Sequence, residues 1–83
     1  MKVRVKYFAS IREALGPGET VALEEGMTVG HLRDRLIQRS PLHAQALARS
    51  RALRCALDQA MCDETAALRD DAEVAFFPPV TGG

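Results

Sequence analysis

The chain has 83 residues, of which 47% are hydrophobic and 27% are charged, and this composition is typical of a single globular domain. Its 11 Lys and Arg residues balance its 11 Asp and Glu residues, which argues against nucleic acid as the main partner. No apolar run approaches the ~20 residues of a membrane span, and the charged N-terminus is unlike a signal peptide. We therefore expect a cytoplasmic protein with no membrane partner.

The first part of the chain predicts a strand, a short helix and a second strand. Apolar and charged residues alternate over 2–7, which is typical of a strand with one buried face. The sequence Ser-Ile-Arg-Glu at 10–13 fits a capping box, and Gly-Pro-Gly at 16–18 stops the helix that it begins. Residues 20–24 again place apolar side chains at every second position, which predicts a second strand paired with the first.

The main helix is predicted directly after this unit. Thr28 suits the N-cap position, and an apolar stripe follows at helical spacing: Val29, Leu32, Leu36 and Ile37. Arg33 is expected on the opposite, solvated side of this helix together with other polar residues. Ser-Pro at 40–41 then signals a further short helical segment that ends near Ser50.

The remainder of the chain predicts three strands. Alternation over 53–57 gives the third strand, and Asp-Gln at 58–59 forms a tight turn into a brief fourth strand over 60–63. The last strand runs over 73–77 and ends at the prolines 78–79, which cannot donate to a sheet ladder. One main helix packed across a mixed sheet accounts for these elements and predicts an α+β domain.

The sequence contains no evident conventional active site. His31 and His43 have no acidic or cysteine neighbours at ligand spacing, so we expect both to be surface or boundary residues. Cys55 falls on the inward register of its strand, where a thiol behaves as a small hydrophobe. Cys62 has no adjacent cation that would activate it, although a reactive thiol remains the alternative there. Both cysteines are expected to stay as thiols, and no metal is expected to bind.

The strongest candidate for a reacting group is the end of the chain, Pro78-Pro79-Val80-Thr81-Gly82-Gly83. Four residues beyond the stiff proline pair reach roughly 13–14 Å when extended, which is far enough to enter a partner's cleft. Glycine has no side chain, so a narrow channel admits it and the terminal carboxylate of Gly83 is uncrowded. The alternative is an ordinary frayed terminus.

Two phenylalanines are predicted to lie on the outer face of the sheet. Phe8 continues the outward register of the first strand, and Phe77 lies on the outward register of the last strand. If these strands are neighbours, both rings share one solvated face, and Met61 of the fourth strand joins them. An exposed apolar cluster of this kind marks a partner surface. The alternative is that local twist buries both rings.

Both ends of the chain resemble one protein family. The segment 6–16, Lys-Tyr-Phe-Ala-Ser-Ile-Arg-Glu-Ala-Leu-Gly, and the ending Phe-Phe-Pro-Pro-Val-Thr-Gly-Gly resemble the small subunits of molybdopterin synthase. These subunits are sulfur carriers of the MoaD type, in the MoaD/ThiS ubiquitin-like superfamily. The resemblance implies a β-grasp domain over 1–79, with a mixed sheet of about five strands, one main helix and short extra helical segments. It also implies adjacent, parallel first and last strands and a flexible tail over 80–83.

In this family the carrier receives sulfur at its C-terminus, which the resemblance places at Gly83. A ubiquitin-activating-type adenylyltransferase uses ATP and Mg²⁺ to form an acyl-adenylate, and a sulfur donor system converts the adenylate to a thiocarboxylate. The tail then enters the large subunit of molybdopterin synthase, where the dithiolene of molybdopterin forms from cyclic pyranopterin monophosphate. The resemblance implies that the large subunit supplies the catalytic groups within a heterotetramer, and that it contacts three residues of the carrier: Phe8, Met61 and Phe77.

Two other functions fit the same sequence. One is a sulfur carrier for another pathway, such as thiazole synthesis, tRNA thiolation or cysteine synthesis. The other is a ubiquitin-like modifier or interaction module without a part in catalysis. A stable complex with a molybdopterin synthase large subunit would distinguish the molybdopterin synthase carrier from a carrier for another pathway. A sulfur-charged form, detected by intact mass, would distinguish either carrier from a modifier.

Overall fold

The computed structural model describes residues 1–79, and the tail predicted over 80–83 lies outside this range. The elements follow in the order β1 (Lys2–Tyr7), α1 (Ala9–Leu15), β2 (Gly18–Ala22), α2 (Val29–Ile37), α3 (Pro41–Ala46), β3 (Arg54–Leu57), β4 (Ala60–Cys62) and β5 (Glu73–Phe77). The predicted bounds of 20–24 for the second strand are wrong. The strand lies two residues earlier, because Gly18 already pairs with Lys6 of β1. None of the helices described is long and apolar enough to cross a membrane.

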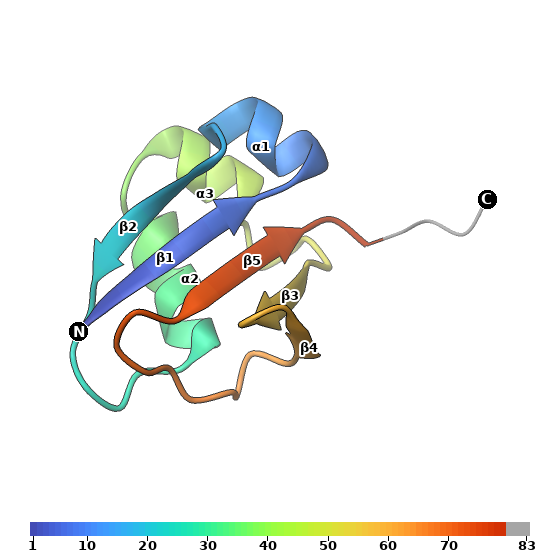
Figure 1. Cartoon of the computed structure of the whole chain (residues 1–83). Coiled ribbons are helices and arrows are strands. Elements are labelled where there is room, and N and C mark those ends of the chain that lie inside the picture. Colours follow the sequence, from blue (N-terminus) through green and yellow to red (C-terminus); the bar gives the residue numbers. More distant parts are fainter. Residues whose placement is uncertain (80–83) are drawn as a thin grey trace.

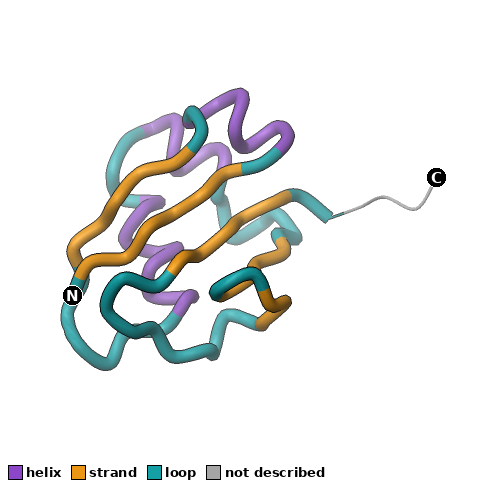
Figure 2. Tube along the Cα trace, viewed as in Figure 1, coloured by secondary structure: helices purple, strands orange, loops and turns teal. Residues whose placement is uncertain are grey.

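The five strands form one mixed sheet in the order β2-β1-β5-β3-β4. β1 is antiparallel to β2 and parallel to β5, and β3 is antiparallel to both β5 and β4. All three helices cover the same face of this sheet (Figures 1 and 2). The prediction that the first and last strands are adjacent and parallel is therefore confirmed, and so is the α+β architecture.

The core lies between the sheet and α2. The inward residues of β1 are almost fully buried, as the alternating sequence predicts. From the other side, Val29, Leu32 and Leu36 of α2 have 0% exposure. Thr28 begins this helix as predicted, and its hydroxyl accepts a hydrogen bond from the His31 amide.

The predicted capping box at Ser10 is wrong. Helix α1 begins at Ala9, and its N-cap is Phe8, which makes no side-chain capping bond. The reason lies in the sheet, because the Phe8 amide donates to the Phe76 carbonyl at 3.2 Å and holds Phe8 in an extended conformation. The Phe8 carbonyl then accepts from the amides of Ile11 and Arg12. Ser10 consequently falls inside the first turn, where it cannot cap.

The prediction that Arg33 faces solvent is also wrong, because Arg33 is only 3% exposed. Its guanidinium donates to the carbonyls of Leu47, Ala48 and Arg51 at 2.9, 2.5 and 3.0 Å, and to Glu64 at 2.7 Å. These bonds take up carbonyls in the segment after α3, which explains why the helix stops at Ala46 instead of near Ser50. The planar fork of arginine suits this role, since one side chain satisfies several buried acceptors.

The predicted hairpin between β3 and β4 is confirmed. Asp58 and Gln59 both have positive φ angles, 49° and 69°, as a two-residue hairpin turn requires. The Asp58 carboxylate accepts a hydrogen bond from the Glu73 amide at 3.0 Å, and the Asp58 amide donates to the Glu73 carbonyl at 2.8 Å. These bonds attach the turn to the start of β5.

Candidate functional site

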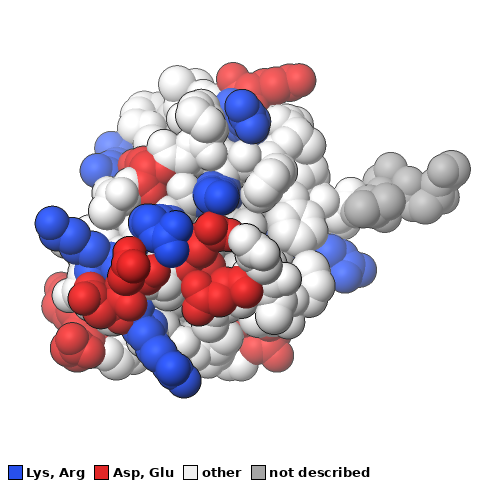
Figure 3. Space-filling model, viewed as in Figure 1, with Lys and Arg blue, Asp and Glu red and all other residues white. Residues whose placement is uncertain are grey.

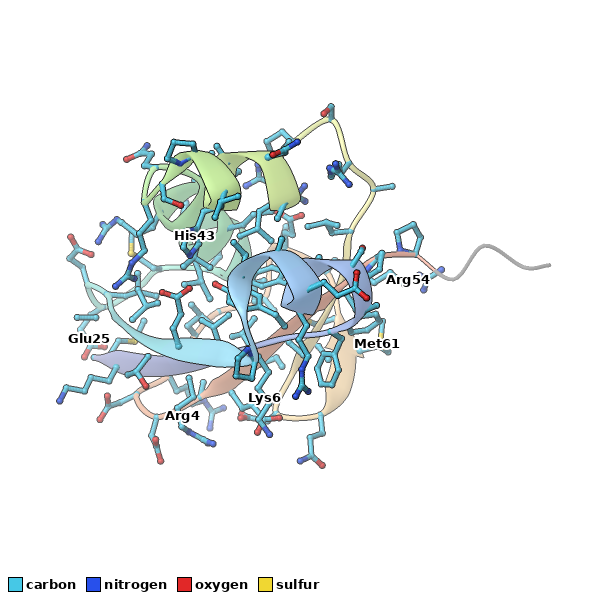
Figure 4. The ribbon with its side chains drawn as sticks, turned by 90° about the horizontal axis from the view of Figure 1, so that it is seen from above. Arg4, Lys6, Glu25, His43, Arg54 and Met61 are labelled. Atoms are coloured by element: carbon cyan, nitrogen blue, oxygen red, sulfur yellow. The ribbon has the colours of Figure 1, made fainter. Side chains whose placement is uncertain are left out.

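The outer face of the sheet, which the helices leave uncovered, carries the candidate site. Direct strand pairing aligns Lys6, Ala75, Ala56 and Met61 in one row across four strands. Paired residues project to the same face, so this row continues the exposed register of β1. The labelled side chains of Arg4 and Lys6 point away from the helix layer (Figure 4).

Phe8 and Phe77 meet on this face, as the sequence predicts. Their ring centroids are 6.3 Å apart and their planes cross at 87°, which is an edge-to-face arrangement. Phe8 remains 43% exposed, and Phe77 is partly buried beside it. The alternative that both rings are tucked into the protein is excluded for Phe8.

Together with neighbouring small residues, these rings form a continuous surface that we call the outer apolar patch: Phe8, Ala56, Met61, Ala75 and Phe77. Met61 is 58% exposed. Ala56 and Ala75 lie between the larger side chains in the strand register, each at 8% exposure. Exposed aromatic and methionine side chains over a floor of small residues are the features of a surface that a partner can cover.

The outer apolar patch lies beside the last described residues of the chain. Phe77 ends β5 and is followed by Pro78 and Pro79. Arg54 and Met61 are also found at this end of the molecule (Figure 4). The predicted reacting residue Gly83, and the predicted tail residues Val80, Thr81 and Gly82, lie outside the described residues.

The ion pairs on this face of the sheet lie beside the outer apolar patch. Glu73 pairs with Lys6 at 3.2 Å and with Arg4 at 3.6 Å, and Arg4 also pairs with Asp71 at 3.2 Å. These pairs lie toward the start of β5, while the surface nearest the end of the described chain is mostly uncharged (Figure 3). Arg54 is opposite Phe77 in the strand register and forms no ion pair with any residue of 1–79.

A second polar cluster links β1, β2 and α3 at some distance from the outer apolar patch. The Tyr7 hydroxyl donates to Glu19 at 2.7 Å, and His43 Nε2 lies 2.7 Å from the same carboxylate oxygen. Arg39 pairs with Glu19 at 3.3 Å. Burial raises the pKa of Tyr7, with the hydrogen bond to Glu19 adding to the effect. The cluster therefore holds an ionised carboxylate against a neutral phenol, and this arrangement ties three elements together.

The carboxylate of this cluster is stabilised in its charged form. Burial alone would raise the pKa of Glu19, but the hydrogen bonds from Tyr7 and His43 outweigh it and hold that pKa below its usual value. His43 is half-buried, as a boundary residue, and His31 accepts from the Thr28 amide within the cap of α2. Sequence spacing gave no signal for this cluster, since its members come from distant segments.

Other common kinds of site are not formed by the residues described. Within 1–79, no group of three His, Cys, Asp or Glu side chains is placed to hold a metal ion. Two shallow pockets, of about 270 and 440 Å³, lie between α1 and α3 and beside Val21, and neither is lined by a His, Cys, Asp or Glu side chain. The outer apolar patch thus remains the candidate functional surface in this part of the chain.

Sequence reasoning also missed the juxtaposition of the two cysteines. Cys55 is buried as predicted, yet the β3–β4 register places it directly opposite Cys62, with the two sulfur atoms 3.7 Å apart. Burial, followed by the contact with Cys62, raises the pKa of the Cys55 thiol to about 12. A signal existed in the sequence, because a two-residue turn at 58–59 fixes which residues of the hairpin pair.

The strand order, the parallel pairing of the terminal strands and the helix across one face define a β-grasp, ubiquitin-like domain. The model of the ThiS family matches residues 5–83 of the chain. The molybdopterin synthase sulfur carrier subunit of Escherichia coli is 38% identical over 81 residues, covering 98% of this chain and 99% of that protein. The chain therefore belongs to the ThiS family.

Solved structures agree with the β-grasp fold. SAMP1 from Haloferax volcanii superposes with a TM-score of 0.80 at 26% identity, covering 100% of both chains. A protein–protein complex of subunits 1 and 2 of the molybdopterin-converting factor from Helicobacter pylori contains a chain that superposes with a TM-score of 0.70 at 24% identity, again with 100% coverage of both chains. The latter likeness concerns the fold alone.

Proposed function

We propose that this chain is the sulfur carrier subunit of a molybdopterin synthase and that Gly83 carries the sulfur. The strongest support is the similarity to the Escherichia coli carrier subunit along nearly the whole of both chains. The family match also extends through the final Gly-Gly. The structure adds an exposed apolar surface next to the strand that leads to this ending.

Activation of the terminal carboxylate is the first step of the proposed cycle. A carboxylate is a poor electrophile, because its negative charge repels nucleophiles and oxide is a poor leaving group. A ubiquitin-activating-type adenylyltransferase would use ATP and Mg²⁺ to form an acyl-adenylate at Gly83, with release of pyrophosphate. Sulfur from a donor system would then displace AMP and leave a thiocarboxylate, which is an anionic sulfur nucleophile.

The outer apolar patch is proposed to bind the large subunit of the synthase. Phe8, Met61 and Phe77 offer two aromatic rings and a flexible thioether, which are residue types enriched at the centres of protein interfaces. Docking on this face would place the end of β5 against the partner and shorten the search of the tail for its acceptor. The gain is one of proximity, since a tethered sulfur reaches a high effective concentration.

The chemistry on the pterin is assigned to the large subunit. Each dithiolene needs two sulfur atoms, so two charged carriers must deliver sulfur for every molecule of cyclic pyranopterin monophosphate converted. The carrier would contribute the sulfur nucleophile and the docking surface. The partner would contribute the groups that bind the substrate and move protons, within a heterotetramer of small and large subunits.

Reconstitution tests the proposal. The thiocarboxylated chain, mixed with the large subunit of the same organism and cyclic pyranopterin monophosphate, should yield molybdopterin in proportion to the carrier supplied. The matched control is the chain lacking Gly83, which should give no product. Sulfur delivery only to thiazole, tRNA or cysteine synthesis would contradict the proposal and favour another carrier pathway. Isopeptide conjugates of the chain with cell proteins, without sulfur transfer, would favour a modifier.

A further inference from the structure

The β3–β4 hairpin brings the two cysteines of the chain together. The strand register pairs Cys55 with Cys62, and their sulfur atoms lie 3.7 Å apart as free thiols. Both side chains project to the helix side of the sheet: Cys55 belongs to the buried core, and Cys62 is partly buried against it. They therefore share an environment from which most of the solvent is excluded.

We propose that Cys55 and Cys62 form a reversible intramolecular disulfide and that the hairpin is a site of oxidation by low-molecular-weight disulfides. Directly paired residues of antiparallel strands have Cα atoms about 4.5–5.5 Å apart, which falls within the range of about 4.4–6.8 Å that disulfides span. The sulfurs must close from 3.7 Å to about 2 Å, and rotation of the two side chains suffices. The backbone can keep its register.

The reaction is a two-step thiol–disulfide exchange with a small disulfide as the oxidant. Cys62, the more accessible thiol, loses its proton to solvent, and its sulfur attacks the small disulfide, releasing one small thiol. The sulfur of Cys55 then attacks the sulfur of Cys62, the bond between Cys62 and the small group breaks, and the departing small thiolate takes the proton of Cys55 to leave as the second small thiol. In total the protein loses two protons and two electrons, and the small disulfide takes up the equivalent two protons and two electrons to become two thiols.

Burial sets the order of these steps. The pKa of Cys55 is raised to about 12, so little thiolate is present at this position to start an exchange from the core. As the second nucleophile, however, Cys55 needs no access to solvent, because its target sulfur already lies beside it. The structure therefore assigns Cys62 as the entry thiol and Cys55 as the resolving thiol.

The bond would fasten a strand that has one neighbour. β4 has three residues, lies at the edge of the sheet and pairs with β3. Met61 lies next to Cys62 in β4 but projects to the opposite face, where it belongs to the outer apolar patch. Oxidation thus restrains the strand that carries Met61 without occupying the surface that Met61 presents.

Mass spectrometry of the full chain tests this inference. The protein is incubated in mixtures of glutathione and glutathione disulfide, then denatured and alkylated, and its intact mass is measured. We expect a monomer that takes up no alkyl group and has lost the mass of two hydrogens, and reduction should restore two alkylation sites. Accumulation of a glutathione adduct, of disulfide-linked dimers or of unreacted protein at the most oxidising ratio would overturn the proposal.

Single variants separate the two roles. Cys55→Ser should accumulate one glutathione adduct at Cys62, because the resolving thiol is missing. Cys62→Ser should remain unmodified while folded, since the remaining thiol is buried. Serine is a suitable replacement at position 55, because the Cys62 carbonyl lies 3.3 Å from the Cys55 sulfur and would accept from a hydroxyl. If Cys55→Ser fails to fold, Cys55→Ala must give the same adduct, and a variant that stays unmodified would refute the assignment.

Discussion

Replacing Phe8 with aspartate should separate binding from stability. Phe8 is 43% exposed, so only about half of its ring is buried, and losing that burial costs roughly 1 kcal/mol. The substitution also removes the edge-to-face pair with Phe77, which is worth about 0.5–1.5 kcal/mol. Phe8 is also the N-cap of α1, with φ −130° and ψ 157° and no side-chain capping bond. Aspartate is a favoured N-cap and should return about 1 kcal/mol. The expected net loss is about 1 kcal/mol, well within the stability of a small domain.

Binding should respond far more strongly. If Phe8 lies at the centre of the interface with the large subunit, its removal costs at least about 2 kcal/mol, which is a loss of affinity of about 30-fold. Titration calorimetry with the purified large subunit measures the affinity. Urea unfolding followed by circular dichroism measures the stability, because the chain has no tryptophan to report by fluorescence.

Leu42→Asp is the matched control for Phe8→Asp. Leu42 is a large apolar side chain that is 58% exposed, but it belongs to α3 on the other side of the molecule. Its replacement should leave the affinity for the large subunit unchanged. Wild-type affinity for Phe8→Asp, or equal losses for both variants, would refute the assignment of the outer apolar patch. A loss of stability above about 3 kcal/mol would place the Phe8 ring in the core, contrary to its exposure.

Three further outcomes are expected. Arg33→Met should lower the free energy of unfolding by about 3–5 kcal/mol, since it removes this donor from the buried carbonyls of Leu47, Ala48 and Arg51; a loss below about 1 kcal/mol in urea would contradict this role. Deleting Gly83 should abolish sulfur transfer while changing the unfolding free energy by less than about 0.5 kcal/mol, and a truncated chain active in reconstitution would refute the carrier site. The folded-state pKa of Glu19 is lowered, so its contribution to stability is complete above its ordinary pKa of 4.5 and is lost as the pH falls through the folded value. Glu19→Gln should therefore flatten the acid limb of the stability curve, and an unchanged limb would count against the cluster.

Much of the fold follows from local sequence signals. The alternation of β1, the Thr28 cap and apolar stripe of α2, and the turn at 58–59 each identify one element, and the structure confirms all of them. These signals are reliable because each depends only on the spacing of apolar residues within one helix or strand, or on the capping and turn residues at its ends. The adjacency of the terminal strands, by contrast, came from the family resemblance.

The sequence predictions failed where distant segments decide the outcome. Arg33 adjoins the apolar stripe, and its burial is made favourable by Glu64 and by the carbonyls of the segment after α3. Ser10 has the sequence of a cap, but the hydrogen bond from Phe8 to Phe76 starts the helix earlier. The cluster around Glu19 likewise depends on three elements meeting. Each case rests on a contact between residues far apart in sequence, which local patterns do not contain.

The outer apolar patch was predictable because strand register has a period of two. Phe8 and Phe77 follow the exposed register of their strands, and one assumption, that the strands are neighbours, places the rings together. The same counting applied to the hairpin would have paired Cys55 with Cys62. Once a turn or a strand pairing is fixed, strand register predicts which side chains of different strands lie together, and the assignment of single helices or strands does not.

The intact mass of the chain is the most direct test of sulfur carriage. The protein is incubated with the adenylyltransferase of the same organism, ATP, Mg²⁺ and a sulfur donor, and its mass is compared with that of the chain lacking Gly83. The full chain should gain the difference between one sulfur and one oxygen atom, and fragmentation should locate that exchange at Gly83. An unchanged mass of the full chain under these conditions would contradict the proposed function.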